Sequence, residues 1–369
     1  YPSPSLGLSL RMLESAIPLH LTQERTQPAK TPDNYEPPTI AYTSRFTENV
    51  KDIVMAIIGA QYASAAGNDG AAISKILEFV KSPTDTEVRP SFWELASVTD
   101  ANGSYNIAIL AYWPSQETYE SWNKVSNFRS WWEGLDTENQ QHGWFLEVFS
   151  PTTDGFETVA SDEKVLEGAA CMREKASGPI LEHVYWGSMR DRMPICQTDA
   201  VPGDTTSSAA QQISSTLRRR VQVPGRQNLV VIRSGQDWSN TPPEEHKLYI
   251  DTMQPPLIEG MTFLRDQGRE IGCHSCRLMD IVDNDTFEVA KDRTFGLAYW
   301  DSLGSLEKWS REHPTHLNIF GTFLKYAKRL DNNVSLRLFH EVLVLKPEQQ
   351  FFEYVGCHEK TGMLASLIS

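Results

Sequence analysis

The apolar positions divide the chain into two halves that predict the same order of elements. In the first half they predict a strand near 39–46, a helix near 48–64 (extending in one interpretation to 81), a hairpin near 92–113, a helix from 115 and a strand near 143–150. In the second half the corresponding stretches lie near 228–233, 243–265, 274–300, from 303, and 335–345. The order β-α-β-β-α-β is that of a ferredoxin-like unit, an antiparallel sheet with helices on one face. The pattern therefore predicts an α+β fold made of duplicated ferredoxin-like repeats.

A repeated stretch supports the duplication. "AYWPSQETYESW" spans 111–122 and "AYWDSLGSLEKW" spans 298–309, an offset of 187 residues. After the shared Ala-Tyr-Trp, both stretches have Ser, Glu and Trp at the same three places. Chance resemblance between two Trp-bearing, β-rich segments is the alternative, but the shared order of elements favours duplication.

The domain division follows from changes in composition along the chain. Residues 1–38 contain seven prolines and predict an extended arm, with disorder as the alternative. The first ferredoxin-like repeat is predicted over 39–192 and the second over 227–355. Between them, 193–226 is rich in Ser, Thr, Gly, Asp and Pro, as expected of a linker. Residues 356–369 form a C-terminal tail.

Composition and charge narrow the class of protein. Hydrophobic residues make up 40% of the chain and there are ten Trp, which suits a globular protein with a sizeable core. The net charge of −14 argues against a nucleic-acid partner. No apolar run reaches the roughly 18 residues that a membrane span needs, so no membrane partner is expected. Five cysteines, an odd number, do not suggest a disulfide framework, and we expect a cytoplasmic protein.

The stretch "REHPTHLNIF" (311–320) contains a candidate ligand. Pro314 suits the first position of a helix, where its missing N–H is not needed, so His316 is predicted in the first turn. One face of this helix would carry His316, Phe320, Phe323 and Ala327. Such an imidazole is either a buried histidine bonded to a carbonyl or a ligand of haem iron, since a porphyrin suits a flat apolar slot. The spacing alone favours the first interpretation, although the first repeat has Arg129 at the aligned position.

A second candidate, His340, lies in the predicted strand "LRLFHEVLVL" (336–345). Alternation places it on the core-facing side with Leu336, Leu338 and Val342. A histidine there is either structural or an acid–base group whose pKa the pocket tunes. The first repeat has Leu146 at the aligned position, so the second repeat alone carries both histidines.

Three other features have ordinary explanations. Ser234 begins "SGQDWSNTPPEEHK", a predicted loop before a helix, so it could be a turn serine. Arg192 could form a surface ion pair with Asp191 or Asp199. "CHSC" (273–276) has the C-x-x-C spacing of a metal half-site, but no second pair exists, so buried unpaired thiols are predicted.

Four stretches together resemble one protein family. They are "YWGSMRDRMPICQTD", "LVVIRSGQDW", "EHPTHLNIF" and "LRLFHEV", and the likeness extends over 12–364. The sequence resembles the aldoxime dehydratases, haem enzymes that convert phenylacetaldoxime or alkylaldoximes to nitriles. The resemblance implies a dimeric α+β-barrel haem protein, haem b that is ferrous in the active form, and a homodimer.

The resemblance also assigns roles to individual residues. It places the proximal haem ligand at His316 and the distal catalytic histidine at His340. It places the serine that hydrogen-bonds the substrate hydroxyl at Ser234 and the supporting arginine at Arg192. An activity-linked glutamate falls on Glu157, for which a capping or ion-pairing role is the alternative.

The chemistry implied by the resemblance is the loss of water from R–CH=N–OH. Ferrous haem would bind the nitrogen, and His340, with an unperturbed pKa of about 6.5, would give a proton to the leaving oxygen near neutral pH. The rivals are another haem chemistry on the same fold, such as a peroxidase or haem-degrading oxygenase, and a haem-binding sensor without turnover.

Overall fold

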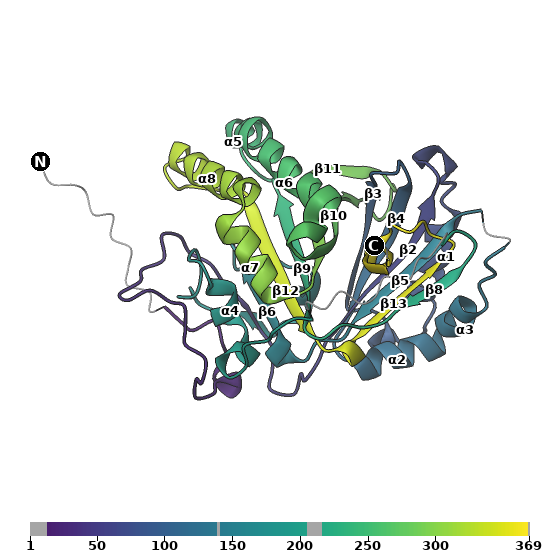
Figure 1. The fold of residues 1–369 in the computed structure, drawn as a ribbon, viewed down its shortest axis with the longest axis horizontal. Helices are drawn as coiled ribbons and strands as arrows, with labels where there is room; N and C mark the ends of the chain where they lie inside the picture. Colours follow the sequence, from purple (N-terminus) through teal and green to yellow (C-terminus); the bar gives the residue numbers. More distant parts are fainter. Residues whose placement is uncertain (1–12, 139–140, 205–215, 368–369) are drawn as a thin grey trace, which may run out of the picture.

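A computed structural model describes residues 13–138, 141–204 and 216–367. The protein has a mixed α/β fold in which one sheet of eleven strands carries helices on its outer faces (Figure 1). The strands of this sheet run in the order β6-β12-β9-β11-β10-β3-β4-β2-β5-β13-β8, and β1 pairs separately with β7. Their bounds are β1 Ser44–Arg45, β2 Val54–Tyr62, β3 Phe92–Thr99, β4 Tyr105–Trp113, β5 Gly143–Phe149, β6 Phe156–Ala160, β7 Lys175–Ala176, β8 Arg220–Val223, β9 Leu229–Asp237, β10 Cys273–Val282, β11 Val289–Trp300, β12 Arg337–Leu345 and β13 Gln350–Val355.

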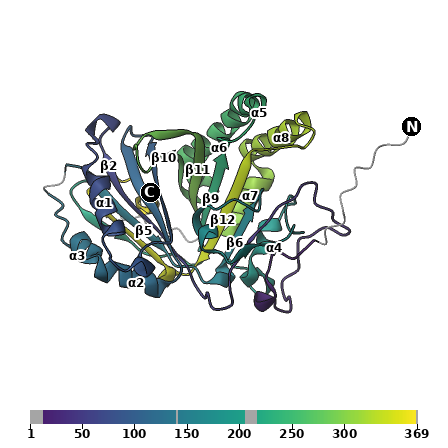
Figure 2. The same cartoon turned by 180° about the vertical axis from the view of Figure 1, so that it is seen from behind.

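The α-helices of the described residues fall in two groups. They are α1 Ala71–Lys81, α2 Gln116–Val125, α3 Phe128–Glu133, α4 Ser188–Arg192, α5 Pro243–Leu248, α6 Gln254–Gln267, α7 Leu303–Glu312 and α8 Pro314–Arg329. Figure 2 shows that α1–α3 lie on one side of the molecule and α4–α8 on the other. No helix in the described part of the chain is long and apolar enough to span a membrane.

The two predicted hairpins and the helices and strands that follow them are confirmed, but the first predicted helix is wrong. Within 48–64 the chain forms β2, whose nine residues are all buried, and α1 begins only at Ala71. The run "VMAIIGAQY" is buried on both faces of the sheet, so it has no polar side to reveal its period. A continuous apolar run of this length fits a strand or a buried helix equally well.

The sheet curls so that its two halves enclose a common core. Ile57, Leu110 and Phe145 of the first half pack in one cluster with Leu297 and Leu343 of the second. The opposite face of β2, β4 and β5 packs against α1–α3. The opposite face of β9, β11 and β12 packs against the α4 region, α6 and α7, and this second outer face carries the candidate site.

The repeated twelve residues have the same local structure in both halves. Ser115 caps α2 by accepting a hydrogen bond from the N–H of Thr118 at 3.1 Å. Ser302 caps α7 by accepting one from the N–H of Ser305 at 3.0 Å. In each half the first Trp packs on the second, with ring centroids 4.8 Å apart in the first half and 5.6 Å in the second.

Strand pairing crosses the predicted division into 39–192 and 227–355. β6 pairs with β12, and β13 pairs with β5, so each half contributes a strand to the edge of the other. The described part of the arm runs along residues 177–199, for example through the N–H of Lys30, which donates to Asp191. Met363 and Leu364 place the tail in the central core. Residues 1–12 of the arm, 205–215 of the linker and 368–369 of the tail lie outside the described residues.

Candidate active site

The start of α8 fixes the position of His316. Pro314 occupies the first helical position, and His313 is the N-cap whose Nδ1 accepts from the N–H of Thr315 at 3.4 Å. This confirms the predicted helix start at Pro314 and places His316 in the first turn, as expected. Helix α8 packs on α6 so closely that a Cβ at Gly260 would lie 2.7 Å from Ile319.

His316 is a neutral imidazole in an aromatic setting. Its ring lies 4.7 Å from that of Trp309 and 6.3 Å from that of Trp186, centroid to centroid. Burial lowers the pKa of His316 to about 4, and the carbonyl of Ser310 offsets only part of this effect. Its Nδ1 is buried without a hydrogen-bond partner in the described part of the chain. A neutral ring of this kind can bind a metal through Nε2.

The face of α8 around His316 suits a flat apolar group. Phe320 and Phe323 follow His316 on this face, and all three side chains are only half-buried. Trp186 is 43% exposed, although its ring packs against Phe320 at 5.4 Å. Partly uncovered aromatic side chains beside an imidazole whose Nδ1 has no hydrogen-bond partner in the described residues suit the flat apolar slot of a porphyrin, so these residues fit a haem.

His340 and Ser234 are brought together by the sheet. His340 on β12 is paired directly with Ser234 on β9. Paired residues in an antiparallel ladder project from the same face with Cβ atoms about 4.5–5.5 Å apart. This face belongs to the outer surface covered by α6 and α7, because Val342, two residues after His340, packs in that cluster.

The prediction that Ser234 lies in a loop is wrong. Strand β9 continues to Asp237, so Ser234 is inside it. Gly235 does not make a turn, since a Cβ there would lie 1.9 Å from the ring of Phe339 on β12. Gly235 is needed for this close approach of two strands, and Ser234 is held in the ladder beside His340.

The charge state of His340 differs from the expectation. Its pKa is lowered to about 4, first by burial, then by the positive charge of Arg192, and last by the charge that His316 carries when it is protonated. His340 is therefore neutral at pH 7 in the haem-free protein rather than partly protonated. The same shift shows that Arg192 and His316 lie within electrostatic range of His340, although they come from different elements.

Arg192 and Glu157 form a buried ion pair beside this group. Arg192 donates from Nε and Nη2 to the two oxygens of Glu157, at 2.7 and 3.0 Å. Nη1 of Arg192 also donates to the carbonyl of Glu182 at 2.8 Å. Arg192 is 6% exposed, so its interpretation as a surface partner of Asp191 or Asp199 is wrong. Glu157 lies on β6 opposite Val342, on the same sheet face as His340.

Gln236 was missed from the sequence, whereas His183 was expected to be structural or to support the site. Nε2 of Gln236 donates to Oγ of Ser234 at 3.3 Å, and its Oε1 accepts from Thr294 at 3.1 Å. Gln236 lies two residues after Ser234, so it would have been predicted on the same face if the predicted strand had extended to residue 237. His183 is 3% exposed, and neither ring nitrogen has a hydrogen-bond partner among the described residues. Burial and the charge of Arg192 lower its pKa to about 4. Its position could not be predicted from its neighbours in the chain.

The C-x-x-C pair plays no part in this group. Cys273 and Cys276 are free, buried thiols on β10, as predicted. Burial raises the pKa of Cys276 to about 12, so the thiol is protonated and a poor ligand at neutral pH. Its Sγ contacts Sδ of Met261 at 3.8 Å.

We expect the haem-free protein to lose stability as the pH falls from about 6.5 to about 4. His183, His274, His316 and His340 all have pKa values lowered to about 4, chiefly by burial. An unfolded histidine, with a pKa of about 6.5, binds a proton that the folded one does not, so acid favours the unfolded state. Each such proton changes the free energy of unfolding by at most about 1.4 kcal/mol per pH unit. Urea midpoints measured between pH 7.5 and 4.5 check this.

The control for this prediction is His274→Gln, because His274 lies outside the site on β10. Carboxylates also titrate in acid and contribute to the slope of stability against pH. Because the substitution removes only one histidine, a difference in slope between the two proteins comes from His274. The slope of stability against pH should become shallower in the variant. An equal slope in both proteins would show that His274 is not held neutral by the fold.

Comparison with known proteins gives the family. The sequence model of the haem-containing dehydratase family matches residues 56–363. An aliphatic aldoxime dehydratase of Pseudomonas sp is 38% identical over 354 residues, which are 95% of this chain and 98% of the relative. A phenylacetaldoxime dehydratase of Bacillus sp. (strain OxB-1) is 34% identical over 339 residues, 90% of this chain and 93% of the relative.

A solved structure agrees with this match. A crystal structure of an aldoxime dehydratase in complex with butyraldoxime is 36% identical and superposes with a TM-score of 0.86, covering 95% of this chain and 96% of that chain. Sequence and fold therefore agree over nearly the whole length. The chain belongs to the family of haem-containing dehydratases.

Proposed function

We propose that this protein dehydrates aldoximes to nitriles with a bound haem, and that His316 is the iron ligand. The observation that carries the proposal is that two buried imidazoles, His316 on α8 and His340 on β12, are neutral at pH 7 and lie near enough for protonation of His316 to lower the pKa of His340. Ser234, Arg192 and Glu157 complete the group of candidate residues around His340. Haem b in its ferrous state would hold the oxime nitrogen and supply electron density for cleavage of the N–O bond.

His340 is suited to move the proton that the reaction transfers. Loss of water from R–CH=N–OH takes a proton from carbon and adds one to the leaving oxygen, so no net proton is consumed. The low pKa of His340 makes its imidazolium a strong acid toward the leaving oxygen and its neutral ring a weak base. His340 therefore accepts the proton of the carbon only as the N–O bond breaks and the leaving oxygen is protonated. The positive charge of Arg192, fixed by Glu157, favours this delivery because it disfavours a protonated His340.

Ser234 is placed to orient the hydroxyl of the substrate. It lies beside His340 in the ladder. Because Nε2 of Gln236 donates to Oγ of Ser234, the hydroxyl hydrogen of the serine remains free to donate to the oxime oxygen. We propose that this bond aims the leaving oxygen at His340.

We also propose duplicated ferredoxin-like repeats, a homodimer and a cytoplasmic location for this protein. The equal capping by Ser115 and Ser302 and the repeated order of elements support duplicated ferredoxin-like repeats that form an α+β barrel. The family resemblance supports a homodimer. The free cysteines support a cytoplasmic location.

Anaerobic turnover tests the proposed function. Haem-loaded, dithionite-reduced protein should form nitrile from butyraldoxime or phenylacetaldoxime without oxygen or peroxide. The two substrates are those of relatives and cover an alkyl and an aryl side chain. Absence of nitrile under these conditions, together with peroxide-dependent oxidation, would instead identify a peroxidase or oxygenase.

A further inference from the structure

The two strands that carry Ser234 and His340 also carry a buried charge pair on their opposite face. Arg233 precedes Ser234 on β9, and Glu341 follows His340 on β12. The register pairs Glu341 with Arg233 as directly as it pairs His340 with Ser234. Because successive side chains of a strand point to opposite faces, the charge pair lies inside the barrel, behind the candidate active site. The side chains of Arg233 and Glu341 are 0% and 2% exposed.

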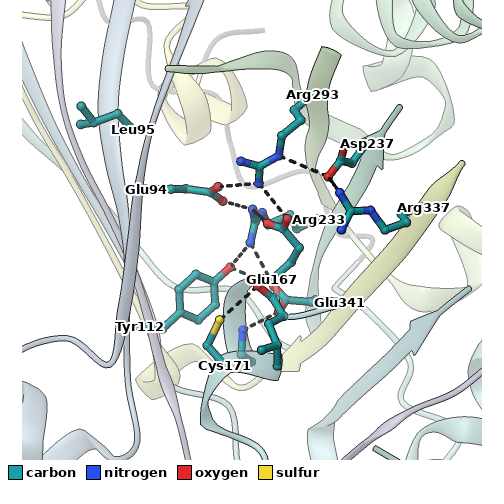
Figure 3. A network of polar contacts seen from close by, with 12 residues as sticks. Glu94, Leu95, Tyr112, Glu167, Cys171, Arg233, Asp237, Arg293, Arg337 and Glu341 are labelled. Carbon is teal, nitrogen blue, oxygen red and sulfur yellow. Dashed lines mark hydrogen bonds and ion pairs between the residues drawn. The ribbon is translucent and has the colours of Figure 1, made fainter. Parts of the chain in front are cut away.

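Figure 3 shows how this pair is held. Oε2 of Glu341 accepts from the hydroxyl of Tyr112 at 2.8 Å, and Oε1 accepts from the N–H of Ala169 at 2.6 Å. Nη1 of Arg233 donates to the hydroxyl of Tyr112 at 3.1 Å and lies 3.9 Å from Oε2 of Glu341. Nη2 of Arg233 is hydrogen-bonded to Glu94 on β3. These contacts fasten β9 and β12 to β4 and β3 across the barrel.

The backbone at Gly168 packs tightly against one side of the pair. Gly168 has a φ of +56°, which favours glycine, and a Cβ there would lie 2.3 Å from Oε1 of Glu341. The same Cβ would lie 2.6 Å from Nη1 of Arg233. An enclosed and bonded charge pair is suited to holding strands in register rather than to binding a molecule.

The first half of the chain contains a buried glutamate that corresponds to Glu341, without a histidine beside it. Glu147 on β5 is hydrogen-bonded to the hydroxyl of Tyr299 and forms an ion pair with Arg277. Tyr299 stands 187 residues after Tyr112, in the repeated "AYW". The residue before Glu147 is Leu146, where the second half has His340 before Glu341. A buried glutamate bonded to a tyrosine hydroxyl therefore occurs once behind the candidate site and once away from it, although Arg277 lies on β10, which is not paired with β5.

We propose that Glu341 and Arg233 are positioning residues for the reaction: their contacts inside the barrel fix the direction of His340 and Ser234 on the outer face. The proposal rests on the proposed function of His340. A register or tilt change at Glu341 moves His340 through the shared backbone, whereas the same change at Glu147 moves Leu146. We expect a loss of about 10–100-fold, by analogy with the residues that orient metal ligands, because a misplacement of about 1 Å by a remote mutation can cost about 100-fold.

The test compares Glu341→Gln with the matched control Glu147→Gln. Both variants remove one buried carboxylate charge beside an arginine and a tyrosine. In the control, Arg277 is left without a carboxylate partner, since the described residues give it no other ion pair, whereas Arg233 keeps Glu94. Urea midpoints should therefore fall at least as much in the control. With the haem Soret band retained in both, kcat of reduced enzyme should fall about 10–100-fold only in Glu341→Gln. Equal losses of kcat would overturn the proposal, and so would an unchanged kcat in Glu341→Gln.

A double variant separates this proposal from the proposed function. If Glu341 acts through His340, then His340→Ala with Glu341→Gln should have the same kcat as His340→Ala alone. Multiplying losses would show that Glu341 acts independently and would reject the positioning role. Unchanged turnover in His340→Ala alone would instead reject the catalytic role of His340. If the glutamine variants do not fold, Tyr112→Phe and Tyr299→Phe make the same comparison, since each removes one hydroxyl.

Discussion

His316→Ala should purify without haem and without activity. His316 is the neutral imidazole at the start of α8 whose Nδ1 is buried and unpartnered, beside the half-covered Phe320 and Phe323. Removing it leaves the iron without its protein ligand. Haem content, measured from the Soret band and as the pyridine complex, should fall to the background of a protein reconstituted without specific binding.

The control for His316→Ala is His313→Ala in the same helix. His313 caps α8 and its ring stacks on Phe263 at 4.1 Å, so its loss should cost about 0.5–2 kcal/mol of stability. Haem content should nevertheless be retained in this variant. Full haem retention with an unchanged spectrum in His316→Ala would show that the iron is bound elsewhere.

His340→Ala should retain haem and lose turnover. General acid–base catalysis contributes about 10²–10⁴-fold, so kcat for the aldoxime should fall by this factor while the Soret band stays in place. The pH dependence adds a second readout. Because the pKa of His340 is lowered to about 4, the neutral form is present above that value, and kcat/KM should fall only as the pH approaches about 4. The urea midpoint of His340→Ala, compared with that of the unchanged protein, checks that the variant is still folded.

Two results would contradict this role. Unchanged kcat in His340→Ala would mean that another group moves the proton. A kcat/KM that rises as the pH falls through about 6.5 would mean that a protonated His340, with an ordinary pKa, is the reacting form in the free enzyme.

The position of His316 could be predicted because it depends on neighbouring residues. Pro314 at the first helical position and His313 at the cap determine where α8 begins, and the helical period then places Phe320 and Phe323 beside the imidazole. The alternation of its strand could place His340 on one face with Val342, but not show that this is the outer face of the sheet rather than the face of the central core. The roles of both residues came from the family resemblance rather than from the pattern.

The surroundings of these residues could not be predicted in this way. Ser234 and Gly235 have the composition of a turn, and only the contact of Gly235 with Phe339 shows that the strand continues. The low pKa of His340 depends on Arg192 and His316, which the fold brings near from other elements. Strand β2 was mistaken for a helix because both of its faces are buried.

The central claim is that His316 and His340 face each other across one haem. The most direct measurement is a crystal structure of the reduced, haem-loaded protein with butyraldoxime bound. We expect Nε2 of His316 to coordinate the iron on one side, and the oxime to lie on the other side with its hydroxyl directed at Ser234 and His340. Iron bound to a residue other than His316, or an oxime hydroxyl out of reach of His340, would contradict the account.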